Sequence, residues 1–123
     1  MDDVEVPGLS RQYLEAVRSF YVGPIDYRAV EISPLNAASH AGLAQAIVIT
    51  AAEDPLRDDG EAYAAALFRS GVEVLACRLP GLPHGFMFLP ATLSAVSQSF
   101  DLISKLVRRY FALGQGPVEA TQR

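Results

Sequence analysis

Two short segments contain an acid and a base of the kinds that enzymes use for proton transfer. Asp54 stands in the segment 53–58, and His84 stands in the segment 81–86. Imidazole is the side chain whose charge changes closest to neutral pH, and a neighbouring carboxylate can accept its Nδ1 hydrogen and hold its orientation. A carboxylate and an imidazole in this arrangement form two thirds of a nucleophilic triad. The third member would be a nucleophile.

Each of these two residues follows a segment with the character of a strand. Residues 46–51 (Ala-Ile-Val-Ile-Thr-Ala) form an apolar run without alternation, which is typical of a strand buried on both faces of a parallel sheet. Residues 72–79 predict a second strand, more polar because of Glu73 and Arg78, as expected near a sheet edge. Ligands of open α/β sheets meet the loops at the carboxyl ends of strands, so we expect chemistry after the first strand and in the loop 80–90.

Three helices are predicted around these strands. The first spans residues 10–22, where apolar residues recur at helical spacing. The second begins near Asp58, which has the spacing of a capping box with Glu61, and it ends at Gly71. The third, an amphipathic helix, spans about residues 92–111. The order helix, strand, helix, strand, helix predicts an α/β fold with a right-handed parallel crossover.

The composition predicts one folded domain. Half of the 123 residues are hydrophobic and a fifth are charged, which is ordinary for a globular chain. The net charge is −4 and the basic residues are scattered, so nucleic acid is not an expected partner. The acidic start and the lack of a long apolar run predict a soluble cytoplasmic protein that does not contact a membrane. Residues 1–113 are expected to fold, and the polar tail 114–123 is expected to fray.

Three motifs together resemble the hormone-sensitive-lipase-type esterases of the α/β-hydrolase fold: Ser-Pro-Leu at 33–35, Asp-Pro-Leu-Arg-Asp-Asp-Gly-Glu-Ala-Tyr at 54–63, and His-Gly-Phe at 84–86. The resemblance covers most of this chain but only the C-terminal portion of that fold. It implies that Asp54 is the triad acid, that His84 is the general base, and that the two strands are the last two of an eight-stranded sheet. It also implies small or medium carboxyl esters as substrates, with no metal and no organic cofactor.

Two other motifs of that family do not occur in the 123 residues. The G-x-S-x-G turn that carries the nucleophilic serine and the HGGG oxyanion loop are both absent. We therefore interpret the chain as a segment of a carboxylester hydrolase that supplies the acid and the base and is inactive by itself. The alternative hypothesis is a non-catalytic remnant or a small-ligand binding module of the same fold.

A partner chain is a further hypothesis, because the strand at 46–51 would lack its inner neighbour and expose a sheet edge. A complementing N-terminal half, or a second copy of this chain, could cover that edge. The family resemblance also implies dimerisation through the last strand and helix.

Structural roles stay open for the residues that carry the resemblance. Asp54 could form an Asx turn with the residues after it, and His84 could be a packed loop histidine. Asp58 is interpreted as a helix cap and not as a second catalytic acid. Phe86 and Phe88 are candidates for lining an acyl-binding pocket, although core packing would also explain them.

Two residues of reactive types are given no role. His40 has no companion His, Cys or acid at the spacing of metal ligands, and we assign it to the surface. Cys77, the single cysteine, falls inside the second predicted strand and is expected to pack as a small apolar side chain.

Overall fold

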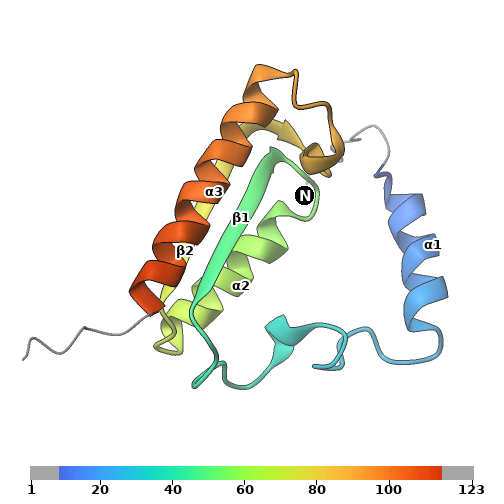
Figure 1. Cartoon of the computed structure of the whole chain (residues 1–123). Helices are drawn as coiled ribbons and strands as arrows, with labels where there is room; N and C mark the ends of the chain where they lie inside the picture. Colours follow the sequence, from blue (N-terminus) through green and yellow to red (C-terminus); the bar gives the residue numbers. More distant parts are fainter. Residues whose placement is uncertain (1–8, 115–123) are drawn as a thin grey trace, which may run out of the picture. The chain divides into compact units, whose positions relative to one another are not determined.

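The structure, a computed structural model, describes residues 9–114 and alternates helices with strands (Figure 1). Along the chain the elements are α1 (Arg11–Val22), the 3-10 helix η1 (Pro34–Asn36), β1 (Ala46–Glu53), α2 (Arg57–Arg69), β2 (Val74–Pro83), the 3-10 helix η2 (Phe86–Phe88) and α3 (Ser94–Gly114). This order confirms the predicted α/β class. The prediction of a frayed tail falls mostly on residues 115–123, outside the described part.

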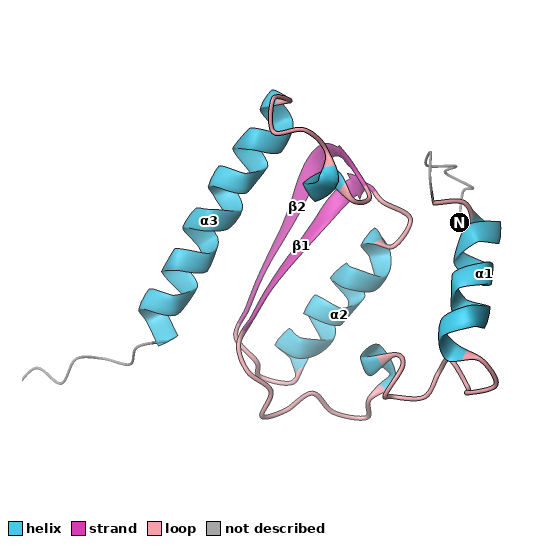
Figure 2. Cartoon of the chain, turned by 45° about the vertical axis from the view of Figure 1, so that its right-hand side comes forward, coloured by secondary structure: helices cyan, strands magenta, loops and turns pink. Residues whose placement is uncertain are grey.

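The described residues form two compact units, which meet in the sequence between Phe86 and Met87. The first unit contains both strands and α2. β1 and β2 are paired in parallel, and α2 lies along one face of the pair (Figures 1 and 2). The predicted parallel crossover is therefore present. Among the described residues β1 has one neighbouring strand, and most of its side chains are half-buried, with Ala51 buried.

The pairing of the two strands changes register before they end. Up to the Ala51–Leu79 pair the partners differ by 28 in residue number, and at the Glu53–Pro83 pair they differ by 30. β2 thus accommodates two additional residues and continues to Pro83, so the prediction of a loop over 80–90 is wrong for its first part. Proline gives no N–H to a ladder and normally marks a strand end, but an irregular ladder tolerates it.

The predicted ends of α1 are confirmed, and those of α3 lie close to the prediction. The Ser10 hydroxyl accepts a hydrogen bond from the Tyr13 N–H at 3.2 Å, and Gly23, with φ of 57°, ends α1. α3 begins at Ser94 and ends at Gly114, and so extends beyond the predicted 92–111 at its C-terminal end. Within the described residues no helix has both the length and the apolar character of a membrane span.

The predicted capping box of α2 is wrong. α2 begins at Arg57, and Leu56 at the cap position makes no side-chain hydrogen bond to the helix. Asp58 lies inside the first turn, where its Oδ1 pairs with Arg57 Nη2 at 2.8 Å. The Glu61 carboxylate accepts hydrogen bonds from Arg78 of β2, because a guanidinium is a stronger donor to a carboxylate than a neutral backbone N–H. The sequence spacing alone could not reveal this partner.

The assignment of His40 to the surface is also wrong, since the residue is only 5% exposed. Its Nε2 lies 2.9 Å from the Pro34 carbonyl oxygen, which can only accept, so Nε2 carries a hydrogen. The imidazole ring meets the Tyr63 ring edge-on, with 5.4 Å between the ring centroids. The backbone N–H of His40 donates to the Ser70 hydroxyl at 3.3 Å. The small residues next to His40 in the sequence give no sign of burial, because the groups that bury His40 come from η1 and from α2 and its C-terminal cap.

Candidate active site

The turn that begins α2 fixes the Asp54 side chain. Its Oδ1 accepts a hydrogen bond from the Leu56 N–H at 2.8 Å, and its carbonyl oxygen accepts one from the Arg57 N–H at 3.1 Å. Arg57 Nη1 also donates to the Ala52 carbonyl at 2.8 Å, which ties the helix start to the end of β1. The Asx turn considered as an alternative for Asp54 is therefore present, and it leaves the second carboxylate oxygen free to face elsewhere.

That second oxygen meets His84. Asp54 Oδ2 lies 2.9 Å from His84 Nδ1, which is the contact expected from the sequence. Because an ionised carboxylate can only accept, Nδ1 carries the hydrogen and Nε2 is left able to accept a proton. The Asp54 side chain is 15% exposed and the His84 side chain 42% exposed. The acid is thus sheltered behind an imidazole that opens to the surroundings, as a general base requires.

The change of register brings the two residues opposite one another. Glu53 and Pro83 are partners in the ladder. Asp54 directly follows the first of them, and His84 directly follows the second. Had the earlier spacing of 28 continued, the residue opposite Asp54 would be Leu82, an apolar side chain. With the spacing of 30, the residue opposite is His84. The two additional residues of β2 therefore decide which side chain Asp54 meets.

Two glycines with positive φ lie on either side of His84. Gly81, inside the irregular part of β2, has φ of 66°, and Gly85 has φ of 69°. A side chain in this left-handed region costs about 1–2 kcal/mol, so glycine is the residue that suits both positions. The backbone can therefore bulge before His84 and turn away directly after it.

The two phenylalanines proposed for substrate binding differ in exposure. Phe86 is buried, at 7% exposed, and belongs to the core, which is the alternative that the sequence left open for it. Phe88 is 94% exposed. A role in binding an acyl group stays a prediction for both. Within residues 9–114 no three His, Cys, Asp or Glu side chains gather as metal ligands would.

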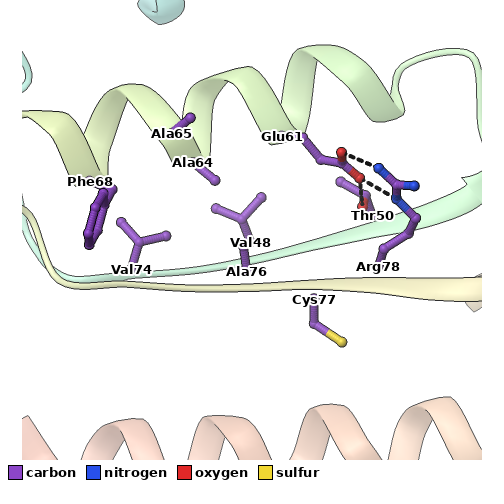
Figure 3. Close-up of a pocket in the computed structure, with 10 residues that line it drawn as sticks. All are labelled: Val48, Thr50, Glu61, Ala64, Ala65, Phe68, Val74, Ala76, Cys77 and Arg78. Atoms are coloured by element: carbon purple, nitrogen blue, oxygen red, sulfur yellow. Dashed lines mark hydrogen bonds and ion pairs between the residues drawn. The ribbon is translucent and has the colours of Figure 1, made fainter.

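A cavity of about 540 Å³ lies between α2 and the two strands, apart from the acid and the base, neither of which lines it (Figure 3). Its walls are mainly apolar and include Phe68 and Val74. In Figure 3 Phe68 and Val74 lie at one end of the set of labelled side chains. Three polar residues lie together at the opposite end: Glu61, Thr50 and Arg78.

The sequence alone did not predict that these three polar residues form a cluster. The hydrogen bond from Arg78, and then that from Thr50, lowers the pKa of Glu61 below the usual range of a glutamate, against the opposing effect of burial. The available signal was Arg78, the single charged residue of the stretch that forms β2, whereas Glu61 follows other charged residues at the start of α2. An isolated charge in a strand is a candidate for pairing with an opposite charge, but only the fold shows that its partner is Glu61.

This chain is similar in sequence and in structure to known proteins. A family model described as alpha/beta hydrolase fold matches residues 2–88. An arylesterase of Saccharolobus solfataricus is 51% identical over 73 residues, which are 59% of this chain and 24% of the arylesterase. The carboxylic ester hydrolase LipN of Mycobacterium tuberculosis is 47% identical over 78 residues, covering 63% of this chain and 19% of LipN. The crystal structure of DphMB1 matches with a TM-score of 0.81 at 30% identity, over 88% of this chain and 36% of that chain.

This chain therefore spans about a quarter or less of the length of these two curated relatives. The family model covers more than half of the chain, and the relatives confirm the resemblance to hormone-sensitive-lipase-type esterases that the three motifs indicated. The chain belongs to the α/β-hydrolase fold family.

Proposed function

We propose that this chain supplies the acid and the base of a serine carboxylester hydrolase, with Asp54 as the acid and His84 as the base. The observation that carries the proposal is the 2.9 Å contact between Asp54 Oδ2 and His84 Nδ1 at the ends of paired strands. Two curated relatives, an arylesterase and a carboxylic ester hydrolase, support it by the activities that their names give. Small or medium carboxyl esters are the proposed substrates.

The proposed mechanism follows from the tautomer of His84. Nε2 accepts the proton of a serine hydroxyl as that oxygen attacks the ester carbonyl, and Asp54 stabilises the imidazolium that forms. The imidazolium then returns the proton to the departing alcohol, which leaves an acyl-enzyme. His84 next accepts a proton from water as the water attacks the acyl group. It then returns this proton to the serine oxygen as the bond to the acyl group breaks, which releases the carboxylic acid and restores the serine. The serine would come from residues outside this sequence, since no G-x-S-x-G turn occurs in it.

The proposed partner is a polypeptide segment with the N-terminal part of the same fold, placed against β1. Among the described residues β1 is paired with β2 alone, so its other edge presents N–H and C=O groups that a further parallel strand would satisfy. A second copy of this chain is the alternative occupant and would make a homodimer. Only a segment with a nucleophile elbow would complete the triad.

A second candidate function is the binding of a small apolar ligand without turnover. The observation in its favour is the cavity of about 540 Å³ beside α2, which is largely apolar and separate from Asp54 and His84. Ligand sites are commonly of this size and character. In this function the acid and the base would be remnants of a catalytic ancestor.

A chimera tests both functions. The part of the Saccharolobus solfataricus arylesterase that precedes its matched segment is fused to this chain, and hydrolysis of p-nitrophenyl butyrate is followed. The proposed function predicts turnover by the chimera and none by this chain or by the arylesterase part alone. A chimera whose circular dichroism shows a folded protein but which has no hydrolytic activity would contradict it. Saturable binding of p-nitrophenyl butyrate without turnover under those conditions would favour the binding module.

A further inference from the structure

Glu61 of α2 contacts both strands at a single position of the ladder (Figure 3). Its Oε1 accepts hydrogen bonds from Arg78 Nε at 2.6 Å and from the Thr50 hydroxyl at 3.2 Å, and its Oε2 accepts one from Arg78 Nη2 at 2.5 Å. Thr50 and Arg78 are themselves paired in the β1–β2 register. One carboxylate therefore connects the helix to two strands and connects the two strands to each other.

This position lies one pair before the change of register. The next pair is Ala51 with Leu79, and the additional residues of β2 follow it. Asp54 stands four residues beyond Thr50, whereas His84 stands six residues beyond Arg78. The two chain segments that lead to the acid and the base thus differ in length, and their ends meet only if both start from the correct pairing.

The contacts of Glu61 are suited to setting geometry more than to adding stability. A bidentate pair between a guanidinium and a carboxylate has a defined orientation in one plane. Its members are partly exposed, with 33% of the Glu61 side chain and 53% of the Arg78 side chain accessible, and ion pairs of that kind contribute little free energy.

Close packing marks the same place. A Cβ atom added to Gly60 would lie 3.0 Å from Thr50 Cγ2, so α2 approaches β1 closely beside Glu61. Because the helix and the strand are so close, the Glu61 side chain can contact both Thr50 and the Arg78 guanidinium. The helix and strand are therefore held together by packing on one side and by hydrogen bonds on the other.

We propose that Glu61 is a positioning residue for the acid and the base: by holding the Thr50–Arg78 pair, it fixes the register from which Asp54 and His84 meet. Its importance for hydrolysis rests on the proposed function. The contact that it positions can be measured without any activity, so the two proposals can fail separately.

The test is nuclear magnetic resonance of the whole chain with ¹⁵N-labelled histidine. The chain has two histidines, His84 with its hydrogen on Nδ1 and His40 with a hydrogen on Nε2, so their ring signals are distinguishable. Glu61→Gln removes the ionic pairing, and the matched control Asp59→Asn removes an exposed carboxylate from the same helical turn. A double variant with Glu61→Arg and Arg78→Glu exchanges the two partners of the ion pair and tests whether the His84 signal is restored.

We expect Glu61→Gln to abolish the His84 Nδ1–H signal while the His40 signals and the dispersion of backbone amides are retained. Asp59→Asn should leave both histidines unchanged, and the exchanged pair should restore the His84 signal at least in part. A purely structural role would move the signals of both histidines together. The proposal is overturned if folded Glu61→Gln keeps the His84 Nδ1–H signal of the wild type.

Two additions keep the test decisive. If Glu61→Gln does not fold, Arg78→Lys is used, because it keeps the charge and loses the bidentate geometry, and a wild-type His84 signal in that variant would overturn the proposal. In an active chimera, Glu61→Gln should lower kcat on the order of tenfold to a hundredfold with KM little changed, as misplacement of a catalytic group does. An inactive chimera would contradict the proposed function and leave the resonance result to decide on Glu61.

Discussion

The two carboxylate oxygens of Asp54 have separate partners. Oδ1 accepts from the Leu56 N–H within the turn, and Oδ2 faces His84 Nδ1. The first contact orients the carboxylate without occupying the oxygen that the imidazole uses. At this residue the structural role and the proposed chemical role therefore support one another and need not be weighed as alternatives.

Replacement of Asp54 by asparagine should change the tautomer of His84 and leave the turn intact. The Asn carbonyl oxygen can still accept from the Leu56 N–H, but its NH₂ group would then face His84 Nδ1 and donate to it. Nε2 would carry the hydrogen and could no longer accept the serine proton. In an active chimera we expect Asp54→Asn to lower kcat on the order of 10³–10⁴-fold, measured by p-nitrophenyl butyrate hydrolysis.

The matched control for this change is Asp58→Asn, four residues further on. Asp58 pairs with Arg57 at the surface, where its side chain is 67% exposed, and it has no contact with His84. Hydrolysis by the Asp58→Asn chimera should stay within about twofold of the parent, since an exposed ion pair contributes little. An equal loss of activity in both variants would argue against a specific role for Asp54.

For the helices and strands, the sequence predicts where the elements lie better than it predicts the register and the side-chain contacts between them. The apolar run of β1 and the helical spacing of α1 and α3 depend on local pattern, and these elements lie close to where the pattern predicts them. The register change in β2 and the partner of Glu61 depend on residues distant in the sequence. Proline at position 80 even predicts the end of a strand that continues to Pro83.

The bulged part of β2 should be sensitive to the loss of a single glycine. Gly81 has φ of 66°, and Gly81→Ala should lower the free energy of unfolding by about 1 kcal/mol because the new side chain is strained. Gly42→Ala is the control, since Gly42 has φ of 79° and equally open space around its Cβ position. Urea denaturation should show similar losses for both, but only Gly81→Ala should weaken the His84 Nδ1–H signal. Equal effects on His84 would show that the bulge does not set the contact.

The link between α2 and the strands should weaken in acid. The hydrogen bond from Arg78 lowers the pKa of Glu61, so the pKa of this carboxyl in the folded chain lies below its value in the unfolded chain. The stabilisation is then fully present above the unfolded pKa and is lost as the pH falls through the folded pKa. Urea denaturation from pH 6 to pH 3 should show a smaller acid-dependent loss of stability for Glu61→Gln than for the wild type.

The control for this measurement is Glu31→Gln, which removes an exposed carboxylate elsewhere in the chain. Its acid-dependent loss of stability should equal that of the wild type. If Glu61→Gln and the wild type lose stability in parallel over the same pH range, the ion pair of Glu61 does not contribute to the acid sensitivity of the fold.

At the scale of the whole molecule, the chain has features of a part of a larger fold. Among the described residues the parallel sheet has two strands, fewer than independent stability normally requires. Large apolar side chains on α1 are exposed, with Phe20 at 92% and Tyr21 at 83%. The arylesterase and LipN are about four and five times as long as the segments that they share with this chain. These observations support the proposed complementing segment.

The assignment of His84 as the base is tested by the rate of ester hydrolysis by the chimera with and without the imidazole. We predict that His84→Ala lowers kcat/KM for p-nitrophenyl butyrate by about 10³-fold or more, while circular dichroism shows an unchanged fold. A His84→Ala chimera that hydrolyses the ester as fast as its parent would contradict the assignment of the base, and with it the proposed function of the chain.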